Sequence, residues 1–157
     1  MASAPREVLG DLAATAFVES SPLFRSLDPE ARRDLVELAQ LVDVPAGEAV
    51  SAEGEESFLL ILEGSASARV GGVEIAHLGR GATFGEGRVL RVGRPMSLVA
   101  STDATVVSFP APMVAALAER FPKMRKLIEV VQAGREKEAA ARLPARPGGR
   151  DDAPAGR

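Results

Sequence analysis

Residues 57–87, SFLLILEGSASARVGGVEIAHLGRGATFGEG, place short runs of strand-forming residues between glycine-rich turns. The apolar run at 58–62 is continuous rather than alternating, which is typical of a strand with both faces buried. Gly71-Gly72 lies between two such runs, and a glycine pair in that place favours a two-residue hairpin turn. The segment therefore predicts antiparallel strands that pack as a sandwich or roll.

The same alternation of strand-forming runs and glycine-rich turns extends over about residues 42–110. Its turn signals recur at intervals of roughly 8–12 residues, as in an all-β sandwich or barrel. We expect helices on both sides of this region. Residues 1–20 are predicted to be a helical or flexible segment, and about 111–142 to form two C-terminal helices. Residues 143–157 have little apolar content, so we expect a disordered tail. The predicted domain is therefore 21–142.

Two helices have clear sequence signals. Asp28-Pro29 predicts an N-cap followed by proline in the first turn, for a helix that runs to about Leu41. After Pro122, apolar residues recur at helical spacing. They are Met124, Leu127, Ile128 and Val131. This stripe has two interpretations: it packs on its own chain, or it forms the seam of a homodimer.

The composition favours binding over catalysis. The chain has 157 residues, 46% of them hydrophobic and 26% charged, with a net charge of −3. This suits a soluble domain and disfavours a protein that coats nucleic acid or an anionic membrane. Because the chain has no cysteine and one histidine, His77, it lacks a thiol nucleophile, a disulfide and a multi-histidine metal site. No signal peptide or apolar span is evident, so we expect a cytoplasmic protein that is not an enzyme.

The stretch GRGATFGEGRVLRVGRPMSLVAS, residues 79–101, carries the chemistry. Glycines on both sides of Glu86 let a ligand approach the backbone closely. A carboxylate accepts hydrogen bonds and so suits a sugar hydroxyl, whereas the guanidinium of Arg94 suits phosphate oxygens. One acid and one arginine in these roles predict a site for a ribose phosphate.

At these residues the sequence resembles the cyclic nucleotide-binding domain family, which includes the catabolite activator protein and the regulatory subunits of protein kinase A. The resemblance covers roughly residues 22–135. It rests on the ordered set of PLFRSLDPEARRDLVELAQLVDVPAGEAV (22–50), EGEESFLLILEGSASARV (53–70), LGRGATFGE (78–86) and RPMSLVA (94–100). The resemblance implies a mainly β fold, an antiparallel, jelly-roll-like β-roll with flanking helices.

The resemblance also implies roles for particular residues. Gly85 and Glu86 would lie at the ribose, with Glu86 accepting a hydrogen bond from its 2′-hydroxyl. Arg94 would pair with the cyclic phosphate, and Ser97 would lie near the phosphate or base. The complete predicted ligand-binding set is Gly85, Glu86, Gly87, Arg88, Arg94, Pro95 and Ser97.

The chain departs from the family pattern inside this set. Arg88 stands where the family has a small residue, and Pro95 follows the arginine directly. Met96 replaces a small alanine, and the spacing from Glu86 to Arg94 is one or two residues short of the family's.

Two functions are consistent with these features. The first is a stand-alone cyclic nucleotide sensor, with cAMP favoured over cGMP as the regulatory ligand. It would hold no metal or other cofactor, and would regulate a partner protein through its C-terminal helix, with a homodimer through that helix as a further possibility. The alternative is a nucleotide-independent interaction or scaffold module on the same fold, which the departures favour. Neither function involves direct contact with nucleic acid or a membrane.

Overall fold

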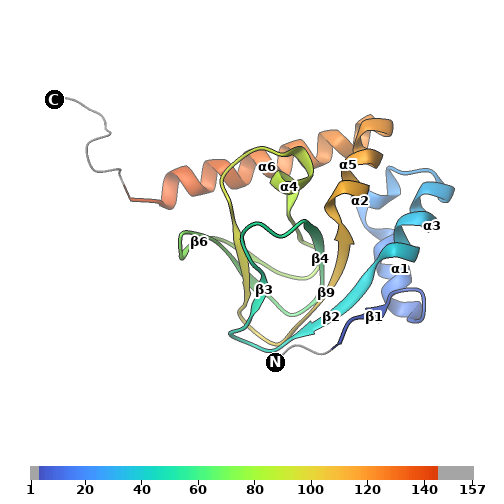
Figure 1. The fold of residues 1–157 in the computed structure, drawn as a ribbon, viewed down its shortest axis with the longest axis horizontal. Helices are drawn as coiled ribbons and strands as arrows, with labels where there is room; N and C mark the ends of the chain where they lie inside the picture. Colours follow the sequence, from blue (N-terminus) through green and yellow to red (C-terminus); the bar gives the residue numbers. More distant parts are fainter. Residues whose placement is uncertain (1–3, 145–157) are drawn as a thin grey trace.

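A computed structural model describes residues 4–144. Two antiparallel sheets pack face to face (Figure 1). The first contains, in spatial order, β1 (Arg6–Glu7), β2 (Gln40–Val44), β9 (Ala104–Pro110), β4 (Ser57–Glu63) and β7 (Thr83–Phe84). The second contains β3 (Ala49–Ser51), β8 (Ser97–Ala100), β5 (Ala66–Val70) and β6 (Val73–Leu78). The predicted mainly β fold with flanking helices is confirmed.

Helices lie at both ends of the chain, and one short helix interrupts the β-region. The N-terminal helices are α1 (Leu12–Ser20), α2 (Pro22–Arg25) and α3 (Pro29–Leu38); the short helix is α4 (Glu86–Leu90); the C-terminal helices are α5 (Ala111–Arg120) and α6 (Pro122–Arg142). In Figure 1, α1, α2, α3 and α5 gather at one end of the sheets. The long α6 extends from that end past α4 to β6, and contacts both. Within residues 4–144, no helix is both long and apolar enough to cross a bilayer.

Strand β4 supplies side chains to both sides of its sheet. Phe58 and Leu60 belong to the core cluster that includes the helices, whereas Leu59 and Ile61 belong to the cluster between the sheets. Successive residues of a strand point to opposite faces, so a strand covered on both faces is apolar throughout. This explains why the run at 58–62 does not alternate.

The glycine pair forms the hairpin turn between β5 and β6. Val70 pairs with Val73, and the two residues between them, Gly71 and Gly72, have φ angles of 56° and 84°. Two consecutive residues in the left-handed region match the twist of antiparallel strands, and glycine adopts that region without steric cost.

Helix α3 begins as predicted but ends earlier. It stops at Leu38, and Gln40 already starts β2, which pairs with β9 from Gln40↔Ser108 to Val44↔Ala104. The prediction of a helix to about Leu41 was therefore wrong. From Gln40 onward, the backbone N–H and C=O groups form hydrogen bonds to β9, so they are not available to extend the helix.

The N-cap of α3 provides a test of local stability. The Asp28 carboxylate accepts a hydrogen bond of 2.8 Å from the Ala31 N–H. We expect Asp28→Ala to lower the free energy of unfolding by about 1 kcal/mol, because it leaves that N–H without its partner. Urea denaturation measures the loss. Asp34→Ala, at an exposed position of the same helix, is the control and is expected to change stability by less than about 0.5 kcal/mol. Equal losses in both variants would contradict the capping role.

Helix α6 packs along two separate parts of the core. Met124 and Ile128 are buried in the cluster shared with the N-terminal helices and α5, whereas Ala139 is buried against the sheets. Gly134, between these anchors, is exposed, and a Cβ atom there would meet no neighbouring atom within 4 Å. The centre of the predicted apolar stripe therefore packs against the core of its own chain. A homodimer stays a prediction. Apart from Leu143 and Pro144, the predicted tail lies outside the described residues.

Candidate functional site

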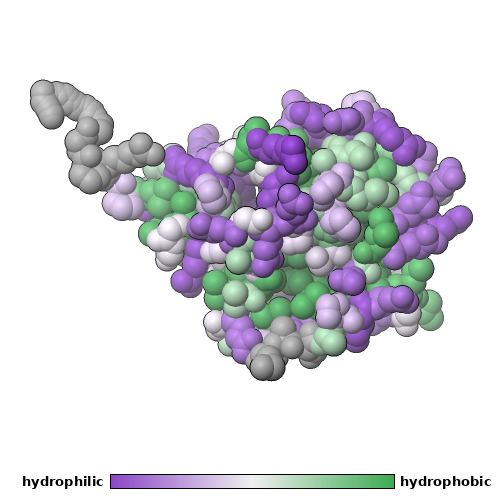
Figure 2. All heavy atoms as spheres, viewed as in Figure 1, coloured by the Kyte–Doolittle hydropathy of each residue, from purple (hydrophilic) through white to green (hydrophobic). Residues whose placement is uncertain are grey.

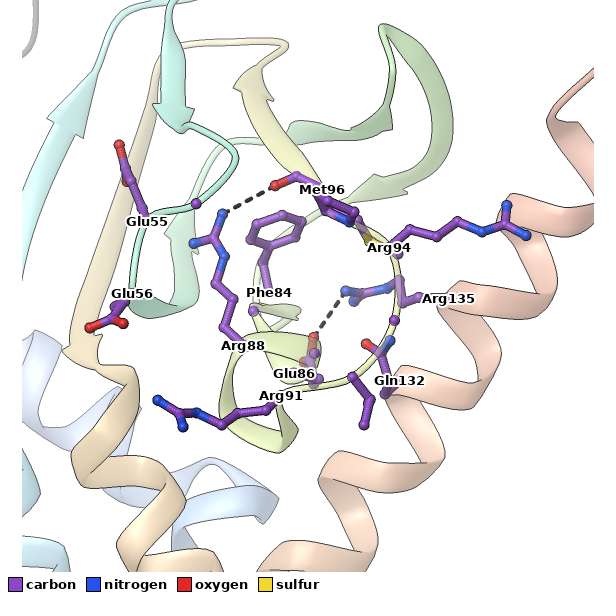
Figure 3. Close-up of a pocket in the computed structure, with 16 residues that line it drawn as sticks. Glu55, Glu56, Phe84, Glu86, Arg88, Arg91, Arg94, Met96, Gln132 and Arg135 are labelled. Atoms are coloured by element: carbon purple, nitrogen blue, oxygen red, sulfur yellow. Dashed lines mark hydrogen bonds and ion pairs between the residues drawn. The ribbon is translucent and has the colours of Figure 1, made fainter.

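A cavity of about 340 Å³ lies where α4 faces α6 (Figure 3). Its walls come from residues 54–56, 84–88 and 91–96, together with Gln132 and Arg135 of α6. This volume is within the range of small-molecule sites. On the face shown in Figure 2, hydrophilic side chains gather around α4 and the adjoining part of α6.

Charged residues dominate the cavity wall. Among the described residues, four arginines and three glutamates line it: Arg88, Arg91, Arg94, Arg135, Glu55, Glu56 and Glu86. The wall therefore has one positive charge in excess, although the chain as a whole is acidic. Such a local excess attracts an anionic ligand.

Glu86 is held in a buried ion pair. Its side chain is 2% exposed, and its Oε1 lies 3.2 Å from Nη1 of Arg135. The Thr83 hydroxyl donates to the other carboxylate oxygen. Arg135 also donates from Nη2 to the Thr83 carbonyl, over 2.7 Å. These contacts join α4 and β7 to α6, and both oxygens of Glu86 have a protein donor.

Arg135 was missed by the sequence reasoning, although a signal for it existed. It lies seven residues after Ile128, which places it on the same face of α6 as the apolar stripe. A charged residue at a core-facing position of a helix indicates a buried partner. Here that partner is Glu86, which is 49 residues away in the sequence.

Arg88 extends from α4 across the cavity toward the segment before β4 (Figure 3). Its Nη1 donates to Ser51 Oγ (2.7 Å) and the Ser57 carbonyl (3.0 Å). Its Nη2 donates to the carbonyls of Ala52 (2.9 Å) and Met96 (3.2 Å). The guanidinium thereby links three segments of the cavity wall.

Phe84 and two glutamates also influence the Arg88 guanidinium. It lies 5.0 Å from the centre of the Phe84 ring, within range of a cation–π contact. Burial lowers the pKa of Arg88, while the negative charges of Glu55 and Glu86 oppose that shift. The guanidinium nevertheless keeps its charge at neutral pH, as arginine does in proteins.

Arg94 lines the same cavity, but its side chain extends over α6 (Figure 3). Nε of Arg94 lies 3.5 Å from Oε1 of Glu136, and the side chain is 41% exposed. The backbone N–H of Arg94 donates to Oε2 of the same carboxylate over 2.9 Å. Glu136 was also missed by the sequence reasoning, and a lone glutamate on a polar stretch of helix carries no sequence signal.

The structure brings most of the predicted ligand-binding residues together. Gly85, Glu86, Gly87, Arg88, Arg94 and Pro95 all line the cavity. Ser97 does not: it begins β8, is half-buried, and pairs with Arg69 of β5. The ladder to β5 fixes its place in the second sheet. The ligand roles of all seven residues stay predictions.

The comparison with protein families agrees with this geometry. The family model described as the cyclic nucleotide-binding domain matches residues 41–121, slightly more than half of the chain. The chain belongs to the cyclic nucleotide-binding domain family, and its two sheets with flanking helices form the β-roll of that family.

The chain is also similar to individual known proteins. The cAMP-dependent protein kinase regulatory subunit of Aspergillus niger is 38% identical over 96 residues, which are 58% of this chain and 23% of that protein. The chain thus spans less than a quarter of that relative's length. The catabolite activator protein of Thermus thermophilus is 29% identical with a TM-score of 0.58, over 77% of this chain and 61% of that one.

A third likeness is one of fold. The regulatory subunit of a cAMP-independent protein kinase A from Trypanosoma brucei superimposes with a TM-score of 0.65 at 19% identity, over 80% of this chain and 49% of that one. The same fold therefore occurs in a protein that is described as cAMP-independent. The ligand of this chain must be argued from its own cavity.

Proposed function

We propose that the chain is a cyclic nucleotide sensor that binds cAMP in preference to cGMP in the cavity between α4 and α6, and regulates a partner protein through α6. The observation that carries the proposal is that a buried carboxylate, Glu86, and a partly exposed arginine, Arg94, line one cavity that has a net positive charge. Membership of the cyclic nucleotide-binding domain family supports a cyclic nucleotide as the ligand. The likeness to a cAMP-dependent regulatory subunit supports cAMP over cGMP.

The two charged residues would recognise different parts of the ligand. Glu86 would accept a hydrogen bond from the ribose 2′-hydroxyl, and Arg94 would pair with the cyclic phosphate. A cyclic phosphodiester carries a single negative charge, which matches the single excess positive charge of the wall. Arg88 would contribute its positive charge from the opposite side of the cavity.

Helix α6 is suited to transmit the bound state. Gln132 and Arg135 form part of the cavity wall, and the rest of the helix packs on α5 and β6. A ligand that contacts this wall in one position of α6 more favourably than in another shifts the equilibrium between the two positions. A partner that binds α6 would then respond to the nucleotide.

Calorimetric titration of the wild-type protein with cAMP and with cGMP tests the proposal. We expect micromolar binding of cAMP and weaker binding of cGMP. Arg94→Ala is expected to weaken cAMP binding at least tenfold, because it removes a charged donor from the phosphate. Arg142→Ala is the matched control, since it removes an exposed arginine of α6 that pairs with Glu138. No heat and no thermal shift at millimolar nucleotide would reject the sensor function.

A second candidate, the nucleotide-independent interaction module, is favoured by one specific observation. Glu86, Arg88 and Arg94 all have protein partners: Arg135, the carbonyl groups around Arg88, and Glu136. Under this alternative, nucleotides leave partner binding and thermal stability unchanged, and Arg94→Ala has no effect on either. A homodimer, a cytoplasmic location and the lack of catalytic activity stay predictions under both functions.

A further inference from the structure

Two consecutive residues of α6 contact the two charged groups that the proposed function assigns to the ligand. Arg135 pairs with the acid, Glu86, and Glu136 pairs with the base, Arg94. The helix thus presents the opposite charge to each. The pair formed by Arg135 is buried, whereas that formed by Glu136 is partly exposed and can exchange its partner more easily.

Glu136 uses the donors that a phosphate would need. One oxygen of its carboxylate accepts the Arg94 backbone N–H at 2.9 Å, and the other lies 3.5 Å from the Arg94 guanidinium. Gln132 also donates from Nε2 to this carboxylate, over 3.3 Å. A backbone N–H together with a guanidinium is a common donor set for an oxyanion. The carboxylate therefore stands in for a bound anion at Arg94.

The loop at 91–95 is shaped to reach this carboxylate. Gly93 has a φ angle of 85°, which favours glycine. A Cβ atom at Gly93 would overlap the side-chain amide of Gln132 and lie 2.6 Å from Oε2 of Glu136. Any other residue at position 93 would have to adopt this strained backbone conformation and displace both side chains. The loop contributes the glycine and the helix contributes the polar side chains that this contact requires.

We propose that Glu136 is an internal competitor for the anionic group of the ligand. This inference rests on the proposed function, because it assumes that Arg94 receives the phosphate. An anion that binds the Arg94 guanidinium and N–H displaces the Glu136 carboxylate, and so separates the 91–95 loop from α6. Glu136 therefore lowers the affinity of the resting site and couples occupancy to the position of the helix.

Calorimetric titration of cAMP into wild type, Glu136→Gln and Glu138→Gln tests this competition. Glu136→Gln keeps the shape of the side chain and removes its charge, so we expect cAMP to bind about tenfold more tightly. Glu138→Gln makes the same change in charge two residues away, where Glu138 pairs with Arg142 and its side chain is 52% exposed. We expect this control to bind within twofold of wild type, which separates local competition from the overall charge of the helix.

The outcomes separate this inference from the proposed function. Tighter binding in Glu136→Gln than in both other proteins supports the competition. Equal binding in all three overturns it and leaves the sensor function standing. Binding by Glu136→Gln with none by wild type supports the competition but overturns the sensor function of the native site. Binding by none of the three overturns both.

Discussion

Replacing Arg135 with alanine is expected to lower the free energy of unfolding by about 3–5 kcal/mol, because the Glu86 carboxylate would stay buried without its counter-ion. Glu86 is 2% exposed and the Arg135 side chain 12% exposed, so water compensates little for the lost partner. The variant also removes the donor to the Thr83 carbonyl. Urea denaturation at neutral pH measures the loss.

The same experiment includes Glu86→Gln and the double variant Glu86→Gln/Arg135→Ala. The double variant is expected to be more stable than the sum of the single losses indicates, because the single Arg135 variant carries the extra cost of an unpaired buried charge. Arg142→Ala, which breaks an exposed pair on the same helix, is expected to cost less than about 1 kcal/mol. A loss of that small size for Arg135→Ala would show that the Glu86 pair does not stabilise the fold.

Replacing Arg88 with alanine is expected to lower the free energy of unfolding by about 2–3 kcal/mol. The carbonyls of Ser57 and Met96 would lose a charged donor, and the cation–π contact with Phe84 would be lost as well. Part of the guanidinium reaches solvent, so water replaces some of these bonds and limits the cost. Thermal and urea denaturation give the change in stability.

Two variants make the Arg88 experiment specific. Arg91→Ala removes the same charge from an exposed position on the same wall, and we expect a change below about 0.5 kcal/mol. Arg88→Lys keeps the charge, but an ammonium lacks the fork needed to reach acceptors on both sides of the cavity, so it is expected to restore only part of the stability. Full recovery with lysine would show that charge alone, rather than the bridging geometry, holds the wall together.

The parts of the fold that local signals specify could be predicted from the sequence. The glycine pair at 71–72 marks its hairpin because few other residues adopt two left-handed conformations in a row. Asp28-Pro29 marks the start of α3 because the cap is a contact between residues three apart. The end of α3 could not be located in this way, because pairing with β9, far along the chain, begins β2 at Gln40.

The residues of the candidate site differ in the same way: those close together in the sequence could be predicted, and those remote in the sequence could not. Gly85 to Pro95 form one continuous motif, so the sequence places them together, and all the predicted members of that motif line the cavity. Arg135 and Glu136 come from a helix that is remote in sequence, and only the packing of α6 against α4 brings them to Glu86 and Arg94. Ser97 lies next to the motif in the chain, yet the ladder to β5 places it elsewhere.

Gly134 is expected to divide α6, a continuous helix, into two cooperative units. A glycine inside a helix weakens it by about 1 kcal/mol relative to alanine, and here no close packing requires one. Met124 and Ile128 hold the first half in the core, whereas the second half depends on Ala139 and on the contacts of Arg135 and Glu136. Amide hydrogen exchange is therefore expected to be slow before Gly134 and faster after it. Arg135 and Glu136, which pair with Glu86 and Arg94, lie on the half that is expected to unfold locally at lower cost.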